Sequence, residues 1–138
     1  MTLTDAQAEE AAADLLAAEE SRSQIGLLSL RHPGMTLDDA YRIQSAQMAR
    51  KLAAGRQIVG WKIGLTSKVM QEALKIDTPD SGVLYDDMIF PNGGTVPAGR
   101  FIQPRIEAEI AFVMKAPLSG EVSRDEVIAA TDYVTPSL

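Results

Sequence analysis

The sequence contains no cysteine and only one histidine, His32, among its 138 residues. The absence of cysteine excludes a disulfide scaffold, thiolate catalysis and any zinc site that uses sulfur. His32 stands beside Pro33 in a segment that predicts a turn, which favours a structural or solvated role for it. A single histidine in such a place argues against a serine–histidine hydrolase and against a histidine-rich metal site.

The sequence has no cluster of basic residues and no long apolar run, and both absences bear on possible partners. The net charge is −6 and the basic residues are scattered, so the sequence lacks the electrostatic footprint of a nucleic-acid-binding protein. No apolar run approaches the roughly 18 residues of a membrane span. Residues 1–20 show no basic region followed by an apolar stretch, which argues against a signal peptide. We therefore expect a cytoplasmic protein that binds neither nucleic acid nor a membrane.

What remains is the composition of an ordinary globular protein, with 46% hydrophobic and 23% charged residues. Capping-box patterns predict helices over about residues 4–23, 36–54 and 123–130, and a shorter helix is predicted over 67–75. Gly55 is expected to end the second of these helices. The first is rich in alanine, which has high helix propensity but little bulk, so we expect it to pack lightly on the rest.

The character of the sequence changes at Gln57, where β-prone segments begin. Strands are predicted over 58–65, 83–90 and 101–115, with a short segment near Val96 and a last strand around 132–134. The pattern divides the chain into a helical region, residues 1–56, and a β-rich region, residues 57–138.

Two glutamates lie on the longest predicted strand. Because side chains alternate along a strand, Glu107 and Glu109 share a face, with Cα atoms about 6.5 Å apart. Both faces become apolar by Ala111, which predicts burial of that end on both sides. A divalent cation would relieve the repulsion and lost solvation of two such carboxylates, and oxygen ligands suit Mg²⁺ or Mn²⁺. The alternative is a half-exposed strand that carries Arg105 and two glutamates on its outer face.

Lys62 and Asp80 are the other candidates for chemistry. Lys62 lies in a short apolar strand between Gly60 and Gly64, an arrangement that suits a cation facing a bound anion. An edge-strand lysine that discourages aggregation would have the same pattern. Asp80 is either a turn residue or a general acid/base at a strand entrance. Arg105 is either a substrate clamp or an ion-pair partner for a glutamate.

Four segments occur in an order that resembles a known family: residues 60–67, 79–84, 104–109 and 130–136. They are similar to the 2-oxopent-4-enoate hydratase and 4-oxalocrotonate decarboxylase family of the fumarylacetoacetate hydrolase superfamily. The resemblance covers about residues 36–138. It implies an α+β fold, in which a helical N-terminal part precedes the first portion of a mixed, β-rich catalytic domain that is truncated here.

The resemblance also implies roles for particular residues. Glu107 and Glu109 match the first two of three carboxylates that hold Mg²⁺ or Mn²⁺, and the third is expected just beyond residue 138. Lys62 and Asp80 match positions that assist proton transfer. Leu84 and Arg105 are the expected substrate-binding positions. We expect this piece to be inactive alone, because one metal ligand and much of the catalytic core lie outside it.

The implied activity is a hydratase of aromatic catabolism, acting on a 2-hydroxy-2,4-dienoate or 2-oxo-4-enoate to give a 4-hydroxy-2-oxo acid. Residues 84–90 look closest to hydratases of 2-oxohept-4-ene-1,7-dioate. The alternatives are a decarboxylase of 4-oxalocrotonate type, a non-catalytic fragment or partner subunit of such an enzyme, and a plain structural domain. We expect a homo-oligomer that associates with a partner enzyme.

Overall fold

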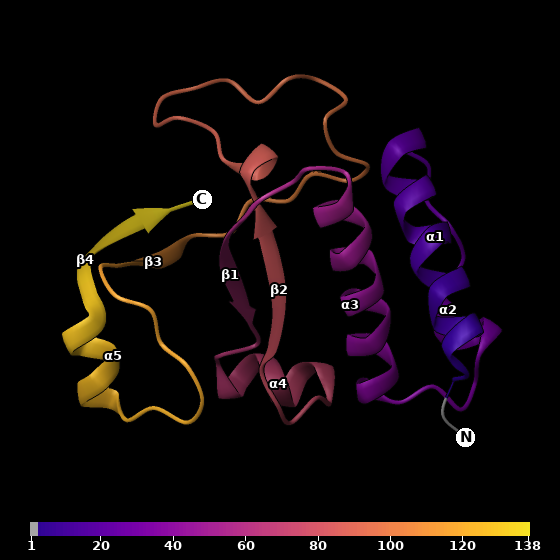
Figure 1. The fold of residues 1–138 in the computed structure, drawn as a ribbon, viewed down its shortest axis with the longest axis horizontal. Coiled ribbons are helices and arrows are strands. Elements are labelled where there is room, and N and C mark those ends of the chain that lie inside the picture. Colours follow the sequence, from indigo (N-terminus) through magenta and orange to yellow (C-terminus); the bar gives the residue numbers. More distant parts are fainter. Residues whose placement is uncertain (1–2) are drawn as a thin grey trace. The chain divides into compact units, whose positions relative to one another are not determined.

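The computed structural model describes residues 3–138 and divides into two compact units, Met1–Ile102 and Gln103–Leu138 (Figure 1). The first unit holds helices α1 (Asp5–Ser21), α2 (Leu28–Arg31), α3 (Leu37–Ala53) and α4 (Lys68–Leu74), strands β1 (Ile58–Gly64) and β2 (Asp80–Tyr85), and a 3₁₀ turn, η1 (Asp86–Met88). The second holds β3 (Glu109–Met114), α5 (Arg124–Ala130) and β4 (Thr131–Ser137). The predicted domain boundary between residues 56 and 57 stays a prediction, although helices α1 to α3 do precede the first strand.

Helices begin where the capping boxes predict. The Thr4 hydroxyl accepts from the Gln7 backbone N–H, and the Gln7 side chain accepts from the Thr4 N–H in return. Thr36 and Ser123 start α3 and α5 in the same way. Each box satisfies two backbone donors that a helix start would otherwise leave without partners. These helix predictions are confirmed, and so are the short helix α4 and the glycine at the end of α3.

The core of the first unit is built on the alanines of α1. The buried cluster contains Ala8, Ala11 and Ala12 of α1, Leu3 just before that helix, and Ile43 of α3. Partly buried apolar residues surround it. The prediction that this helix packs lightly was wrong. Small side chains on α1 allow Ile43 of α3 to pack against it, and Leu15 of α1 adds to the same core.

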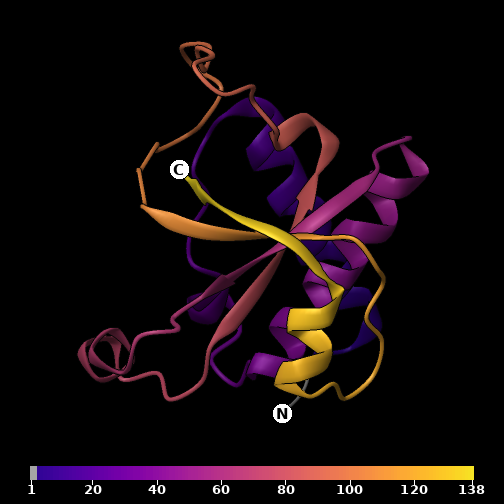
Figure 2. The same ribbon diagram turned by 90° about the vertical axis from the view of Figure 1, so that its left-hand side faces the viewer.

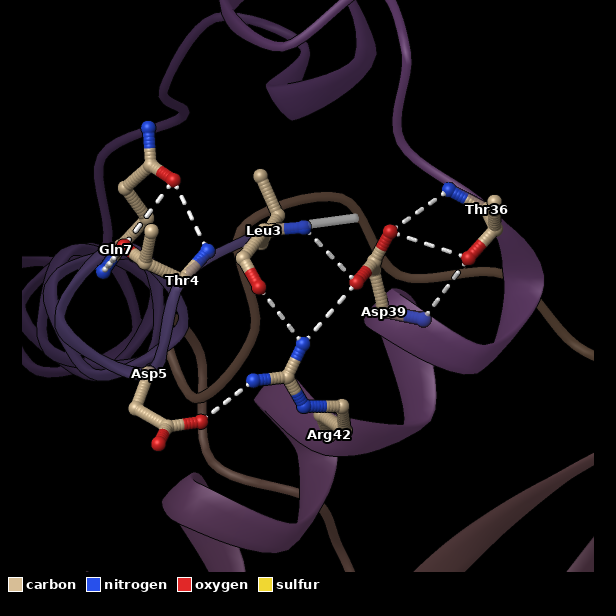
Figure 3. A network of polar contacts seen from close by, with 7 residues as sticks. All are labelled: Leu3, Thr4, Asp5, Gln7, Thr36, Asp39 and Arg42. Atoms are coloured by element: carbon tan, nitrogen blue, oxygen red, sulfur yellow. Dashed lines mark hydrogen bonds and ion pairs between the residues drawn. The ribbon is translucent and has the colours of Figure 1, made fainter. Parts of the chain in front are cut away.

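A buried carboxylate fastens the starts of α1 and α3 together (Figure 3). Asp39 has no solvent exposure and accepts hydrogen bonds from the backbone N–H groups of Leu3 and Thr36 at 3.0 Å each. The Arg42 guanidinium donates to Asp39 and also to the Leu3 carbonyl. These bonds favour the charged form, so the pKa of Asp39 is lowered, chiefly by the Thr36 backbone N–H.

Strands β1 and β2 form an antiparallel pair, with Lys62 opposite Gly82 and Gly64 opposite Asp80. Helix α3 supports β2 through Ser81, whose N–H donates to the Tyr41 hydroxyl at 3.1 Å and whose carbonyl accepts from the Gln44 side chain at 3.0 Å. Backbone groups of β2 are therefore satisfied by α3 side chains, and the strand is held in one place beside that helix (Figure 1).

The second unit is a β-hairpin with one short helix between its strands. β3 pairs antiparallel with β4, and α5 leads directly into β4 (Figure 2). The predicted strand around 132–134 is confirmed and extends further, over Thr131–Ser137. Ile110 and Phe112 remain 72% and 57% exposed, so the expected burial of β3 on both sides was wrong. A two-stranded hairpin has too few layers to cover both of its own faces.

Two predicted strand limits were also wrong, and one short predicted segment is not a strand. Residues 101–108 are not part of a strand: pairing begins at Glu109, opposite Ser137, and Pro104 lacks the backbone donor that a ladder needs. The strand expected over 83–90 ends at Tyr85, where the Asp86 carboxylate accepts from the Gln57 N–H and a 3₁₀ turn begins. The segment near Val96 is not a strand.

Among residues 3–138, no helix combines the length and the apolar character needed to cross a membrane.

Candidate functional site

One face of the β1–β2 pair brings together three residues that the sequence analysis singled out. The opposite pairs are Gly60 with Leu84, Lys62 with Gly82, and Gly64 with Asp80. Because residues directly opposite each other share a face, and alternate residues along a strand do too, Lys62, Asp80 and Leu84 lie on the same face. Lys62 and Asp80 are exposed, so a small molecule can reach this face.

Each of these three pairs joins a glycine to a residue with a side chain. A Cβ atom on Gly82, opposite Lys62, would meet no other atom within 4 Å, so there is open space at that position. A Cβ on Gly64 would overlap the carboxylate of Asp80. The glycines therefore keep the face shallow between these side chains, which allows a ligand to approach the backbone closely.

Tyr85 closes the far end of β2. Its side chain is buried, the Lys51 ammonium lies 4.8 Å from its ring centroid, and Lys51 also pairs with Glu19 of α1 at 2.7 Å. Burial, with a smaller contribution from the negative charge of Glu19, raises the pKa of Tyr85 above its ordinary value. Tyr85 thus stays neutral and serves to pack β2 against the helices.

The two candidate metal ligands lie in the second unit. Glu109 is the first residue of β3, whereas Glu107 lies in the non-strand segment before it, and both are exposed. The prediction that a single strand carries both glutamates was therefore wrong, because the ladder begins only at Glu109. The binding of one cation by Glu107 and Glu109 stays a prediction. Within residues 3–138, no three or more acidic, histidine or cysteine side chains are grouped so as to hold a metal ion.

Arg105 is exposed in the same segment as Glu107, and its two possible roles stay open. The neighbouring arginine Arg100 was not singled out from the sequence. It donates to the backbone carbonyl and the carboxylate of Asp87, and Arg56 pairs with the same carboxylate at 3.3 Å. This cluster anchors the loop after η1. No sequence pattern predicts this cluster, because Arg56, Asp87 and Arg100 come together only when the chain folds.

Asp39 was likewise missed as a buried anchor. The sequence signal was present, since Asp39 stands at the third helical position of a capping box. Its second role, accepting the Leu3 N–H from 36 residues away, depends on tertiary contact. The sequence pattern shows a cap, whereas the structure shows a link between two helices.

Comparison with known proteins gives these features a context. No protein-family model matches the chain. It is 49% identical over 122 residues to the 2-oxo-hept-4-ene-1,7-dioate hydratase of Escherichia coli, a match that covers 88% of this chain and 46% of that enzyme. It is 46% identical over 137 residues to the 2-keto-4-pentenoate hydratase of Paraburkholderia xenovorans, covering 99% of this chain and 51% of the relative. The chain is homologous to about half of these enzymes.

A solved structure leads to the same group. The 4-oxalocrotonate decarboxylase of Pseudomonas putida G7, complexed with magnesium and adipate, superposes with a TM-score of 0.91 at 42% identity. The match covers 97% of this chain and 51% of the decarboxylase. A complex of the same enzyme with calcium and acetate matches equally well. The family resemblance is thus confirmed, and the mixed helix-and-strand fold matches that of a decarboxylase over about half its length.

Proposed function

We propose that the protein to which this chain belongs is a divalent-metal-dependent hydratase that adds water to a 2-hydroxy-2,4-dienoate or 2-oxo-4-enoate. One structural observation carries the proposal: Lys62 and Asp80, on different strands, share one open face floored by glycines. The names of the relatives, which include hydratases of three such substrates, support the same reading. The chain spans about half the length of these relatives, and we propose that it is inactive by itself.

The residues of this face suit the two proton transfers that the reaction requires. The Asp80 carboxylate is a base for the 2-hydroxyl proton, and the carboxylic acid so formed returns a proton to C5 of the substrate as the dienol becomes the conjugated ketone. The Lys62 ammonium offsets the negative charge that develops on the substrate during this step and during water addition. Leu84, on the same face, offers an apolar contact to the carbon chain of the substrate. Arg105 is proposed as a further substrate contact through its guanidinium.

The proposed metal ligands are Glu107 and Glu109, with a third carboxylate from outside residues 3–138. Hard oxygen donors of this kind fit Mg²⁺ or Mn²⁺, and the two decarboxylase complexes hold magnesium and calcium. The bound cation would supply Lewis-acid stabilisation of charge on the carboxylate and 2-oxo oxygens of the substrate. An acidic protein also needs such a cation to attract an anionic substrate.

Two further features belong to the proposal. The substrate class supported by the 49% identical relative is the one with a second carboxylate, 2-oxohept-4-ene-1,7-dioate. We also infer a homo-oligomer in the cytoplasm that associates with a partner enzyme of the same catabolic sequence. Sedimentation of the protein alone, and with a decarboxylase or hydratase partner, tests that assembly.

The runner-up function is decarboxylation of a 4-oxalocrotonate-type acid. It is favoured by the TM-score of 0.91 and by a 44% identical decarboxylase from Pseudomonas. A longer polypeptide carrying this sequence should be assayed with Mg²⁺ for water addition and for CO₂ release on matched substrates. Water addition without CO₂ release supports the hydratase. CO₂ release favours the decarboxylase, and neither product, with no Mn²⁺ binding, favours a non-catalytic partner subunit.

A further inference from the structure

The carboxylate of Asp80 lies across the backbone of Gly64. All three atoms of the carboxyl group are within 4 Å of the point where a Cβ on Gly64 would stand, with Cγ at 3.2 Å and Oδ2 at 3.6 Å, and Oδ1 would overlap it. The two residues are direct partners in the β1–β2 ladder. An alanine at position 64 cannot coexist with the observed carboxylate position.

The other two glycines of this face provide a built-in comparison. A Cβ on Gly60 would make an ordinary contact of 3.8 Å with Leu84 Cδ1, and a Cβ on Gly82 would meet nothing within 4 Å. None of the three has a positive φ, so the backbone accepts alanine at each. Glycine in a strand interior lowers stability relative to alanine. Of these three positions, only position 64 has a close contact that explains why glycine is used there.

We propose that Gly64 is the positioning residue for Asp80. Because position 64 has no side chain, the carboxylate folds over β1 instead of pointing away from the ladder. Lys62 stands two residues before Gly64 on the same face, so this orientation directs the carboxylate toward the strand that carries Lys62. The catalytic consequence rests on the proposed function of Asp80, whereas the steric relationship does not.

The first test measures side-chain conformation and needs no activity. The Asp80 side-chain torsion χ1 and its ¹³Cγ chemical shift are measured by NMR in the original protein and in three variants: Gly64→Ala, Gly60→Ala and Gly82→Ala. We expect a new χ1 rotamer and a shifted ¹³Cγ resonance in Gly64→Ala alone. An Asp80 side chain that is unchanged in Gly64→Ala, or changed equally in all three variants, would overturn the proposal.

A stability cycle separates this contact from a general effect on the strand. Urea midpoints are compared for Gly64→Ala, Asp80→Ala and the double variant. Since Asp80→Ala removes the overlapping atoms, the Gly64→Ala substitution should change the midpoint less favourably in the original background than in the Asp80→Ala background. An equal loss in both backgrounds contradicts the proposal.

The catalytic consequence is tested in a longer polypeptide that carries this sequence and shows activity. We expect Gly64→Ala to lower kcat by about 10-fold or more, up to the roughly 10²–10⁴-fold that general acid–base catalysis contributes, with Mn²⁺ affinity unchanged. It should add nothing to the loss caused by Asp80→Ala. Gly26→Ala is the control, because Gly26 lies in a loop with nothing within 4 Å of its Cβ position.

The two proposals fail in different ways. If Asp80 changes its rotamer in Gly64→Ala while kcat stays the same, Gly64 positions Asp80 but the proton-transfer role of Asp80 is wrong. If kcat falls equally in the presence and absence of the Asp80 carboxylate, Gly64 does not act through Asp80, and the positioning proposal is wrong.

Discussion

The carboxylate of Asp39 accepts a hydrogen bond of 3.0 Å from the backbone N–H of Leu3, which lies 36 residues earlier in the sequence. The same carboxylate caps its own helix through Thr36. Asp39 therefore joins the entrances of α1 and α3, the two helices whose contact forms the core of the first unit (Figure 3).

We expect Asp39→Asn to make the stability of the first unit lower and less dependent on pH. The pKa of Asp39 is lowered in the folded protein, so its contribution is present above the ordinary carboxyl pKa of about 4 and is lost as pH falls through the folded-state pKa. Thermal midpoints measured from about pH 2 to about pH 7 cover this titration. They should fall with acid more steeply in the original protein than in the variant.

Asp38→Asn is the matched control for this experiment. Asp38 is the exposed neighbour in the same first turn of α3, and it carries the same charge near the helix start. Its replacement should leave most of the acid dependence in place. Equal flattening of the pH profile by both variants would show that helix-dipole charge, and not the buried link to Leu3, produces the effect.

The alanine packing between α1 and α3 gives a second prediction. Ala12 has no solvent exposure, so Ala12→Leu forces a large side chain into a filled interior and should cost about 1–3 kcal/mol of unfolding free energy. Urea denaturation followed by far-ultraviolet circular dichroism measures the loss. Ala17→Leu, on the exposed side of the same helix, should cost much less. Similar costs at both positions would contradict the close packing of α1.

The capping box of α5 gives a third prediction. The Ser123 hydroxyl accepts from the Glu126 N–H, and the Glu126 carboxylate accepts from the Ser123 N–H, which lowers the pKa of Glu126. Ser123→Ala removes one half of this exchange and should destabilise the helix by about 1 kcal/mol. Amide hydrogen exchange in α5 should then be faster, whereas Ser119→Ala, in the preceding loop, should leave it unchanged.

The proposed metal ligands give a fourth prediction. In a longer polypeptide carrying this sequence, Glu107→Ala and Glu109→Ala should each weaken Mn²⁺ binding by at least about 10-fold, since residues that only support a ligand are already worth about 10- to 100-fold. Titration followed by electron paramagnetic resonance measures free Mn²⁺ directly. Glu121→Ala, which replaces an exposed glutamate of the same unit, should leave Mn²⁺ affinity unchanged. Unchanged affinity in both ligand variants would exclude these glutamates as the metal site.

Local chemistry explains which parts of the fold could be predicted. The hydroxyls of Thr4, Thr36 and Ser123, with the carboxamide or carboxylate that stands three residues after each, satisfy backbone donors locally, so helix starts are encoded where they occur. The segments around Lys62, Asp80 and Glu109 were likewise recognisable from residue type and order, and the homologous hydratases and decarboxylases confirm the resemblance.

Strand limits were predicted less well, because a strand lasts only as long as its partner. The apolar pattern of residues 101–115 predicts one long strand, yet pairing begins at Glu109, opposite Ser137. Likewise, the residues next to Ile110 and Phe112 in the sequence do not predict whether another layer of structure covers these two side chains. Burial depends on neighbours that residue patterns do not name.

The helix starts, the β-prone segments and the residue types available for acid–base and metal chemistry follow from the amino-acid sequence alone, because these depend on groups a few bonds apart. That Lys62, Asp80 and Leu84 share a face follows only from folding, since it depends on the register of β1 against β2. A slip of one residue would send every side chain of the slipped strand to the opposite face. The same register places Asp80 over Gly64, and Asp39 reaches Leu3 only after α1 and α3 have packed.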